Sequence, residues 1–250
     1  MHSLTRENFF DIFILAGKNL SKENLFTWEV IKMKKNLTIE NLISEAKSFC
    51  EIASKQNHLD LIGVTDGKAV GTYIEHKFKR FLETDYKFSE GNSAKGIDLP
   101  DENILTDIKV TSISQPQSSC PFKSARQKIF GLGYNLLVLV YEKLDSSNKC
   151  TLKFLNCTFI EKSRTADFTI TKRLLEMLKD GAIKEDIISY LSDRNIPGDE
   201  IILENLAEEI LNNPPQQGYL TISNALQWRL QYTRVINLKN SVEGVLNYDF

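Results

Sequence analysis

The spacing of apolar residues predicts helices in the first third of the chain and again towards its end. Between residues 38 and 55, apolar side chains recur at helical intervals with charged side chains opposite them, and Thr38 is suited to cap the helix start. A second amphipathic pattern runs from about residue 69 to 82, and its expected core residues are Ala69, Tyr73, Phe78 and Phe81. Three further helical patterns follow late in the chain and stop at Pro214–Pro215.

The middle of the chain changes to the two-residue period of β-strands. The runs "YNLLVLVYEKL" and "CTLKFLNCTFIE" are typical of strands. From 86 to 160 we expect the order strand, strand, loop, helix, strand, strand. Near the C-terminus, Trp228, Leu230 and Tyr232 alternate with polar residues, which favours a strand over a helix that begins at Ser223. These patterns predict an α/β core flanked by helices.

Composition excludes several classes of protein. A chain of 250 residues can bury a substantial core, and its formal net charge of −2 gives no overall attraction to nucleic acid or anionic lipid. No apolar run is long enough to span a membrane, and the apolar N-terminal stretch contains Asp11 and lacks a basic lead, so we expect a cytoplasmic protein. The four cysteines form no CxxC pair, which favours buried thiols over structural zinc.

The stretch "GIDLPDENILTDIKVTS", residues 96–112, carries the candidate chemistry. If its middle forms a turn, paired positions add up to about 205, and Asp98 then faces Asp107 directly across two short strands. Lys109 lies on the same face as Asp107 because side chains alternate along a strand. Burying two opposed carboxylates costs several kcal/mol, which a divalent cation removes. Oxygen ligands with no nearby His or Cys favour Mg²⁺ over zinc.

A metal, two carboxylates and a lysine suit the hydrolysis of a phosphodiester. The alternative is that the two carboxylates flank a solvated turn and that Lys109 is a surface lysine. Apolar residues alternate with the polar ones here, which favours strands with one buried and one functional face. The helix upstream adds Glu75, followed by basic residues that include Lys79 and Arg80, as expected beside a phosphate backbone.

The order of these elements resembles the core of the PD-(D/E)xK nucleases: a helix with Glu, a strand with Asp, a strand with DxK, then a helix and a strand. The "DIKVTS" strand is similar to that of several type II restriction endonucleases, and the resemblance covers roughly residues 69–142. It implies a restriction-endonuclease-like core, with a mixed central sheet flanked by helices. We expect an N-terminal helical region (1–65), a catalytic core (66–162) and a C-terminal helical region with DNA-recognition strands (163–250), packed as one compact unit.

In that family two acidic residues bind Mg²⁺ and the lysine acts on the nucleophilic water. Matched residue by residue, this implies Asp98 and Asp107 as metal ligands and Lys109 as the cation that positions the water. Glu75 becomes an auxiliary catalytic acid and a further metal ligand. One departure is that the proline directly precedes Asp101, not Asp98. Asp101 lies too close to Asp107 for two paired strands, so we prefer Asp98 and keep Asp101 as the alternative.

Basic and amide side chains indicate where DNA is contacted. Arg pairs with guanine and Gln with adenine through two hydrogen bonds each in the major groove. The polar side chains of the segment 112–128 are suited to phosphates or a groove edge. The candidates lie on the helix of Glu75, on that segment and near the C-terminus: Lys79, Arg80, Gln115, Gln117, Lys123, Arg126, Gln227, Arg229, Gln231 and Arg234.

The resulting expectation is a Mg²⁺-dependent restriction endonuclease that cuts double-stranded DNA at specific sites and leaves 5′-phosphates. A palindromic site implies a two-fold homodimer, and the host needs a cognate DNA methyltransferase to protect its own sites. Two alternatives stay open. One is a repair or junction-resolving nuclease with the same catalytic residues. The other is a non-catalytic helix-turn-helix regulator formed by the segment 171–212, although apolar residues at helical spacing there equally fit a simple core.

Overall fold

The computed structural model describes residues 34–91, 96–120, 123–223 and 228–250. The helices expected before residue 34 and the DNA-contacting role of Gln227 lie outside these ranges. In the described part of the chain, no helix is both long and apolar enough to cross a membrane. All four cysteines are buried and free of disulfides, which confirms the interpretation of their spacing.

A four-stranded mixed sheet forms the centre of the molecule, in the spatial order β3-β5-β6-β9. Its strands are β3 (Thr106–Ser112), β5 (Asn135–Asp145), β6 (Cys150–Ile160) and β9 (Val245–Asp249). β3 and β5 are parallel, and the other two neighbouring pairs are antiparallel. The two long apolar runs of the sequence are therefore strands, as predicted, and the sheet also takes a strand from the end of the chain.

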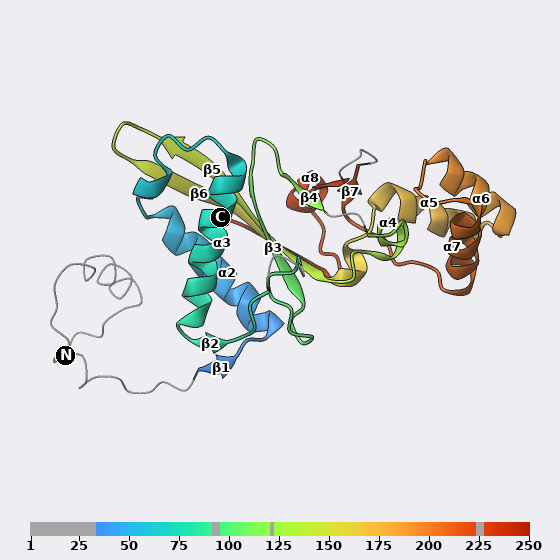
Figure 1. Ribbon diagram of the computed structural model, residues 1–250, viewed down its shortest axis with the longest axis horizontal. Helices are drawn as coiled ribbons and strands as arrows, with labels where there is room; N and C mark the ends of the chain where they lie inside the picture. Colours follow the sequence, from blue (N-terminus) through green and yellow to red (C-terminus); the bar gives the residue numbers. More distant parts are fainter. Residues whose placement is uncertain (1–33, 92–95, 121–122, 224–227) are drawn as a thin grey trace.

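Two helices, α2 (Ile39–Ser54) and α3 (Gly67–Glu83), cover one face of this sheet (Figure 1). Thr38 caps α2 by accepting the N–H of Asn41, as predicted. Asp66 caps α3 by accepting the N–H of Lys68. Since a side-chain cap satisfies a backbone donor that the helix leaves free, these two residues fix where the helices begin.

Of the predicted core residues of α3, Phe78 and Phe81 are buried, as expected, and the two nearer the start of the helix are not. Ala69 is exposed and Tyr73 is half-buried, whereas Val70, Ile74 and Phe78 are buried. Residues four apart form one row along a helix, so Val70, Ile74 and Phe78 meet the sheet together. Ala69 and Tyr73 belong to the neighbouring row, which lies at the edge of the contact.

β5 is covered on both faces, because its alternate side chains enter two different cores. Leu137 and Leu139 pack towards α2 and α3. Leu136 and Val138 point the other way, into a core shared with a second sheet. A strand that is buried on both sides reads as a continuous apolar run, which explains "NLLVLV".

The second sheet has three antiparallel strands in the order β4-β8-β7. Its strands are β4 (Gln117–Cys120), β8 (Trp228–Gln231) and β7 (Thr221–Ile222). The polar segment before residue 121 was expected to be a loop, and the structure places β4 within it. β4 exists because it pairs with β8 from far along the chain, and a tertiary pairing of this kind leaves no local period in the sequence.

The strand predicted near the C-terminus is confirmed over β8. Trp228 and Leu230 are buried, whereas Arg229 and Gln231 are exposed. Tyr232 is also buried, as the alternation predicts, and the strand ends before it because the chain turns into the short helix α8 (Thr233–Ile236).

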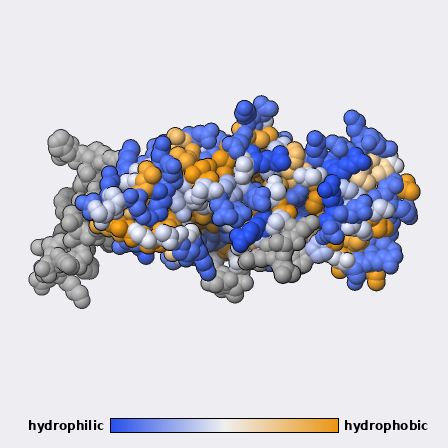
Figure 2. All heavy atoms as spheres, turned by 90° about the horizontal axis from the view of Figure 1, so that it is seen from above, coloured by the Kyte–Doolittle hydropathy of each residue, from blue (hydrophilic) through white to orange (hydrophobic). Residues whose placement is uncertain are grey.

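Three helices form one end of the elongated molecule, and the short helix α4 (Arg126–Phe130) joins them to the second sheet (Figure 1). They are α5 (Phe168–Lys179), α6 (Lys184–Asp193) and α7 (Glu200–Asn212). Their apolar side chains pack against one another and against α4 in a separate core. Figure 2 shows hydrophilic side chains interspersed with smaller apolar groups over the face it presents. The remaining elements are short: β1 (Lys35–Asn36), β2 (Tyr86–Lys87), η1 (Leu59–Leu61) and η2 (Lys162–Arg164).

Candidate active site

The turn before β3 brings Asp98 to Asp107 in the predicted register. Leu99 and Thr106 form an antiparallel bridge with backbone hydrogen bonds of 2.9 and 3.0 Å in the two directions. This is the pairing expected from the sequence, and it places Asp98 opposite Asp107 at the next position. The two carboxyl groups interact directly.

The first of the two expected strands is reduced to this single bridge. An antiparallel ladder would next use the N–H of Ile108 for the carbonyl of Ile97. Instead, that N–H donates to Oδ2 of Asp98 at 2.9 Å. The side chain of Asp98 therefore replaces the next rung of the ladder, and the same hydrogen bond holds its carboxylate against β3.

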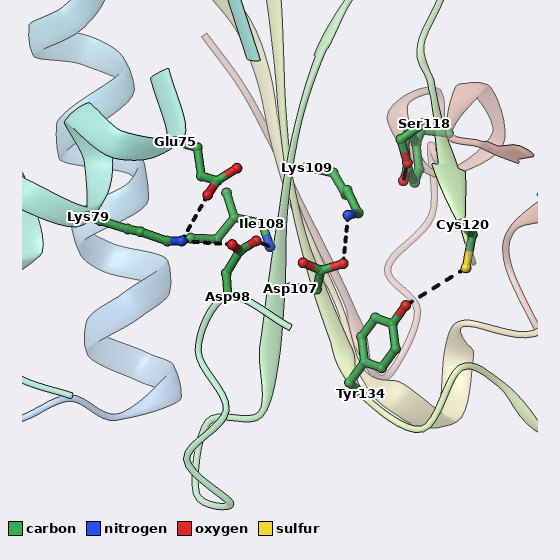
Figure 3. A network of polar contacts seen from close by, with 10 residues as sticks. Glu75, Lys79, Asp98, Asp107, Ile108, Lys109, Ser118, Cys120 and Tyr134 are labelled. Atoms are coloured by element: carbon green, nitrogen blue, oxygen red, sulfur yellow. Dashed lines mark hydrogen bonds and ion pairs between the residues drawn. The ribbon is translucent and has the colours of Figure 1, made fainter. Parts of the chain in front are cut away.

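Asp107 and Lys109 lie on the same face of β3, as the alternation along a strand requires. The Nζ atom of Lys109 is 2.7 Å from Oδ2 of Asp107 (Figure 3). Asp107 is only 3% exposed, so its charge cannot be stabilised by bulk water.

The two carboxyl groups differ in acidity, because hydrogen bonds outweigh the effect of burial at Asp98 but not at Asp107. Loss of hydration raises the pKa of Asp107 to about 7, with a contribution from Asp98 and against the opposing effect of Lys109. Burial also acts to raise the pKa of Asp98. The hydrogen bonds that Asp98 makes with Asp107, Lys79 and the N–H of Ile108 outweigh burial and lower its pKa to about 2. Below neutral pH the pair therefore retains one proton, on Asp107.

On the other side of Asp98, the ammonium group of Lys79 contacts two carboxylates. Its Nζ atom lies 2.8 Å from Oε1 of Glu75 and 2.7 Å from Oδ1 of Asp98 (Figure 3). Glu75 and Lys79 are four residues apart on α3 and so project from the same side of the helix. Lys79 was expected at the DNA surface, whereas it lies within the site and is 7% exposed.

Tyr134 and Cys120 form the wall beyond Asp107. The Tyr134 hydroxyl lies 3.8 Å from the Cys120 Sγ atom. Burial raises the pKa of both groups above their ordinary values, so they surround Asp107 without adding charge. Neither residue was selected from the sequence, because no spacing links them to Asp107. The spacing of Glu75 and Lys79, by contrast, was a visible signal that the two side chains interact.

Asp101, the alternative to Asp98, lies in the turn and makes a different contact. Its carboxylate accepts the backbone N–H of Ser89 at 2.8 Å. Hydrogen bonding with Ser89 lowers the pKa of Asp101. The carboxyl group that meets Asp107 belongs to Asp98.

A cleft of about 1030 Å³ opens beside Lys109. It is bounded by the start of α3, by the segment from β3 to β4, by part of β5 and by Arg229. Gln115 and Gln117, two of the residues expected to contact DNA, also line it. Glu75, Asp98 and Asp107 are not among its lining residues, whereas Lys109 is. Lys109 therefore lies between these three acids and the cleft.

The second sheet brings together three residues from two distant segments that were expected to contact DNA: Gln117, Arg229 and Gln231. Gln117 pairs with Gln231, and Ser119 pairs with Arg229. Directly opposed residues of an antiparallel pair project from the same face, so these four side chains form one polar face. Gln117, Ser119 and Arg229 reach the cleft.

The other predicted DNA contacts lie away from the cleft lining. Arg126 forms two-pronged hydrogen bonds with Glu209 of α7, at 2.6 to 3.0 Å. The guanidinium carbon of Arg234 lies 3.7 Å from the ring centre of Phe168. Two further basic residues are exposed at the surface: Arg80 and Lys123.

The donor set of the site suits a hard cation. Among the residues that the structure describes, no three Asp, Glu, His or Cys side chains gather as a ready-made metal cage. Mg²⁺ does not require one, because it is usually bound through one or two carboxylates together with waters and substrate phosphates. The adjacent carboxyl groups of Asp98 and Asp107 meet that requirement, whereas a zinc site would call for His or Cys ligands.

Comparison with known proteins places the chain in a family. Residues 36–247 match the family described as "Type II restriction enzyme NspV". A protein of that name from Nostoc sp. (strain ATCC 29411 / PCC 7524) is 56% identical over 212 residues, which cover 84% of this chain and 96% of that enzyme. No solved structure matches the chain. The matched residues include α3, the turn, β3 and the cleft, and the chain belongs to the NspV family of type II restriction enzymes.

Proposed function

We propose that this chain is a site-specific endodeoxyribonuclease that hydrolyses double-stranded DNA with Mg²⁺, through Asp98, Asp107 and Lys109. Its membership of a family of type II restriction enzymes supports the activity and the substrate. The observation that carries the assignment of residues is the buried carboxyl pair, with Lys109 bound to it at the edge of the cleft.

Asp98 and Asp107 are the residues that hold the ion. When bound, Mg²⁺ activates water and stabilises the charge that develops on the scissile phosphate and the leaving group. Carboxylates bind metal only when they are deprotonated, so Asp107 must release its proton. The raised pKa of Asp107 makes this loss easiest at neutral and higher pH.

Lys109 links the acids to the substrate. The ion pair with Asp107 outweighs burial and raises the pKa of Lys109, so the side chain stays protonated. A protonated lysine donates hydrogen bonds but accepts none. Lys109 therefore orients the attacking water and neutralises a phosphate oxygen, and it does not act as the base. In-line attack on the phosphorus leaves a 5′-phosphate and a 3′-hydroxyl.

The polar face of the second sheet reads the DNA. Arg229 is exposed on β8 and lines the cleft, where a guanidinium group can make two hydrogen bonds to guanine. Gln115 and Gln117 line the same cleft and are suited to adenine or to backbone contacts. The groups that recognise bases thus lie beside the lysine that faces the scissile phosphate.

The biological assembly follows from the proposed substrate. A palindromic site calls for a homodimer whose two-fold axis matches that of the DNA. A cytoplasmic enzyme of this kind works beside a DNA methyltransferase, because the host must protect its own sites. Analytical ultracentrifugation with and without a DNA duplex tests the dimer: a monomer under both conditions would contradict it.

Paired substitutions test the assignment of the metal ligands. We expect Asp98→Asn to abolish cleavage of unmethylated phage DNA in Mg²⁺, because it removes a carboxylate ligand. Asp101→Asn, three residues away in the same turn, is expected to cut as the wild type does, since the Asp101 carboxylate meets Ser89. Cleavage by the Asp98 variant at the wild-type rate would reject the site, and loss of cleavage by the Asp101 variant alone would move the ligand to Asp101.

A further inference from the structure

Lys79 is the basic residue of α3 that turns into the acidic site, unlike its two basic neighbours on that helix. Lys77 donates a hydrogen bond to Oε1 of Gln56 at 2.6 Å, and Arg80 is exposed. Lys79 is instead 7% exposed and contacts both Glu75 and Asp98. Burying a lysine is costly unless its charge is matched, so two carboxylate partners give it a stable position there.

The ammonium group of Lys79 lies where a cation shared by Glu75 and Asp98 would have to lie. It is 2.8 Å from one carboxylate oxygen and 2.7 Å from the other (Figure 3). A divalent ion that bridges the same two oxygens would have to displace it. Without this ammonium group, the two partly buried carboxylates would face each other with no positive charge between them.

The contacts of Asp98 show which side remains for a metal ion. Its Oδ1 atom accepts from Lys79, and its Oδ2 atom accepts from the N–H of Ile108. Its carboxyl group also meets Asp107. The positive charge on that side, Lys109, contacts Oδ2 of Asp107, whereas Lys79 contacts both Glu75 and Asp98. One ion can therefore bind between Asp98 and Asp107 while Lys79 keeps its place.

We propose that Lys79 is a resident cation of the active site, which occupies the position of a second metal ion, so that the site binds a single divalent ion at Asp98 and Asp107. The proposal rests on the proposed function, because it concerns the same carboxylates. It changes the role of Glu75, which then serves as an anchor for Lys79 and not as a metal ligand. Lys79 is a positioning residue that fixes Asp98 for the ion.

Counting bound Mn²⁺ tests the proposal without relying on cleavage. The free ion is measured by electron paramagnetic resonance during titration of the metal-free, full-length protein. We expect one site in the wild type. Lys79→Met removes the charge at nearly constant volume and is expected to bind a second ion, between Glu75 and Asp98. Lys79→Arg keeps the charge and is expected to bind one ion. Lys77→Met, which changes a lysine of the same helix that faces Gln56, is the matched control and is expected to bind one.

The outcomes separate the two levels of the proposal. Two ions in the wild type, or one ion in the Lys79→Met variant, would overturn the role of Lys79 and leave the nuclease site standing. If Lys79→Met does not fold, Lys79→Gln keeps a hydrogen-bond donor without the charge, and its expected count is also two. If the Asp107→Asn variant still cleaves DNA and still binds Mn²⁺ as the wild type does, the proposed site itself is overturned.

Discussion

Replacing Asp107 with Asn is expected to remove a pH dependence of folding that the metal-free protein otherwise shows. Asp107 is 3% exposed, and the pKa of its carboxyl group is raised from 3.8 to about 7. Between these two values the folded state holds a proton that the unfolded chain has released. The contribution of Asp107 to stability is therefore fully present below pH 3.8 and is lost as the pH rises to about 7.

The size of the effect follows from the shift. One pKa unit corresponds to about 1.4 kcal/mol, so the shift from 3.8 to about 7 corresponds to a loss of about 4 kcal/mol in unfolding free energy as the pH rises through this range. Asp98 has the opposite sign, because its pKa is lowered from 3.8 to about 2, and its contribution is lost only at pH values below 3.8. The two effects thus fall in separate pH ranges. Asparagine keeps a carbonyl oxygen for Lys109 and has no proton to lose.

Urea unfolding in EDTA, at about pH 5 and about pH 7, measures the effect as the difference in unfolding free energy between wild type and Asp107→Asn. That difference is expected to change by about 2 kcal/mol in favour of the variant as the pH rises, because Asp107 is still half protonated at pH 7. Asp101→Asn serves as the control, since the Asp101 carboxylate accepts a hydrogen bond at the turn surface. Wild-type and Asp107→Asn curves that stay parallel across this range would refute the buried, protonated carboxyl group.

Three further substitutions probe catalysis, recognition and the core. Lys109→Met is expected to slow plasmid cleavage about 10²- to 10³-fold while DNA binding in a gel shift is retained, and loss of binding instead would make Lys109 a simple DNA contact. Arg229→Ala is expected to reduce discrimination at one base pair by about 1–3 kcal/mol, measured on duplexes with single substitutions. Arg126→Ala should leave that preference unchanged, because Arg126 is paired with Glu209. Phe78→Ala is expected to cost about 3–5 kcal/mol in urea unfolding, since the ring is completely buried, and a cost below about 1 kcal/mol would contradict its place in the core.

The local part of the site could be predicted from the sequence because it depends on short-range geometry. The turn fixes the register of Asp98 against Asp107, and the two-residue period fixes Lys109 beside Asp107. The exposed face of β8 followed from the same period, which is visible in the alternation around Arg229. In each case a few consecutive residues carry the whole signal.

The remaining features depend on contacts between distant segments. β4 forms only because β8 pairs with it, so nothing in the polar stretch around Gln117 marks a strand. Lys79 was expected beside the phosphate backbone because it lies among the basic residues that follow Glu75. Its inward position follows from the direction that α3 takes over the sheet, together with the four-residue spacing from Glu75. Arg126 was expected to contact DNA. Its actual partner, Glu209 on α7, lies far along the chain, so the sequence gives no sign of their ion pair.

The central claim is that the carboxyl pair and Lys109 form the catalytic site of a restriction endonuclease. The most direct measurement is digestion of unmethylated phage DNA in Mg²⁺, by wild type and by Lys109→Met in parallel. We predict discrete fragments with 5′-phosphate ends from the wild type and uncut DNA from the variant, although both proteins bind the DNA. The same fragments from the variant, produced at the wild-type rate, would contradict the claim.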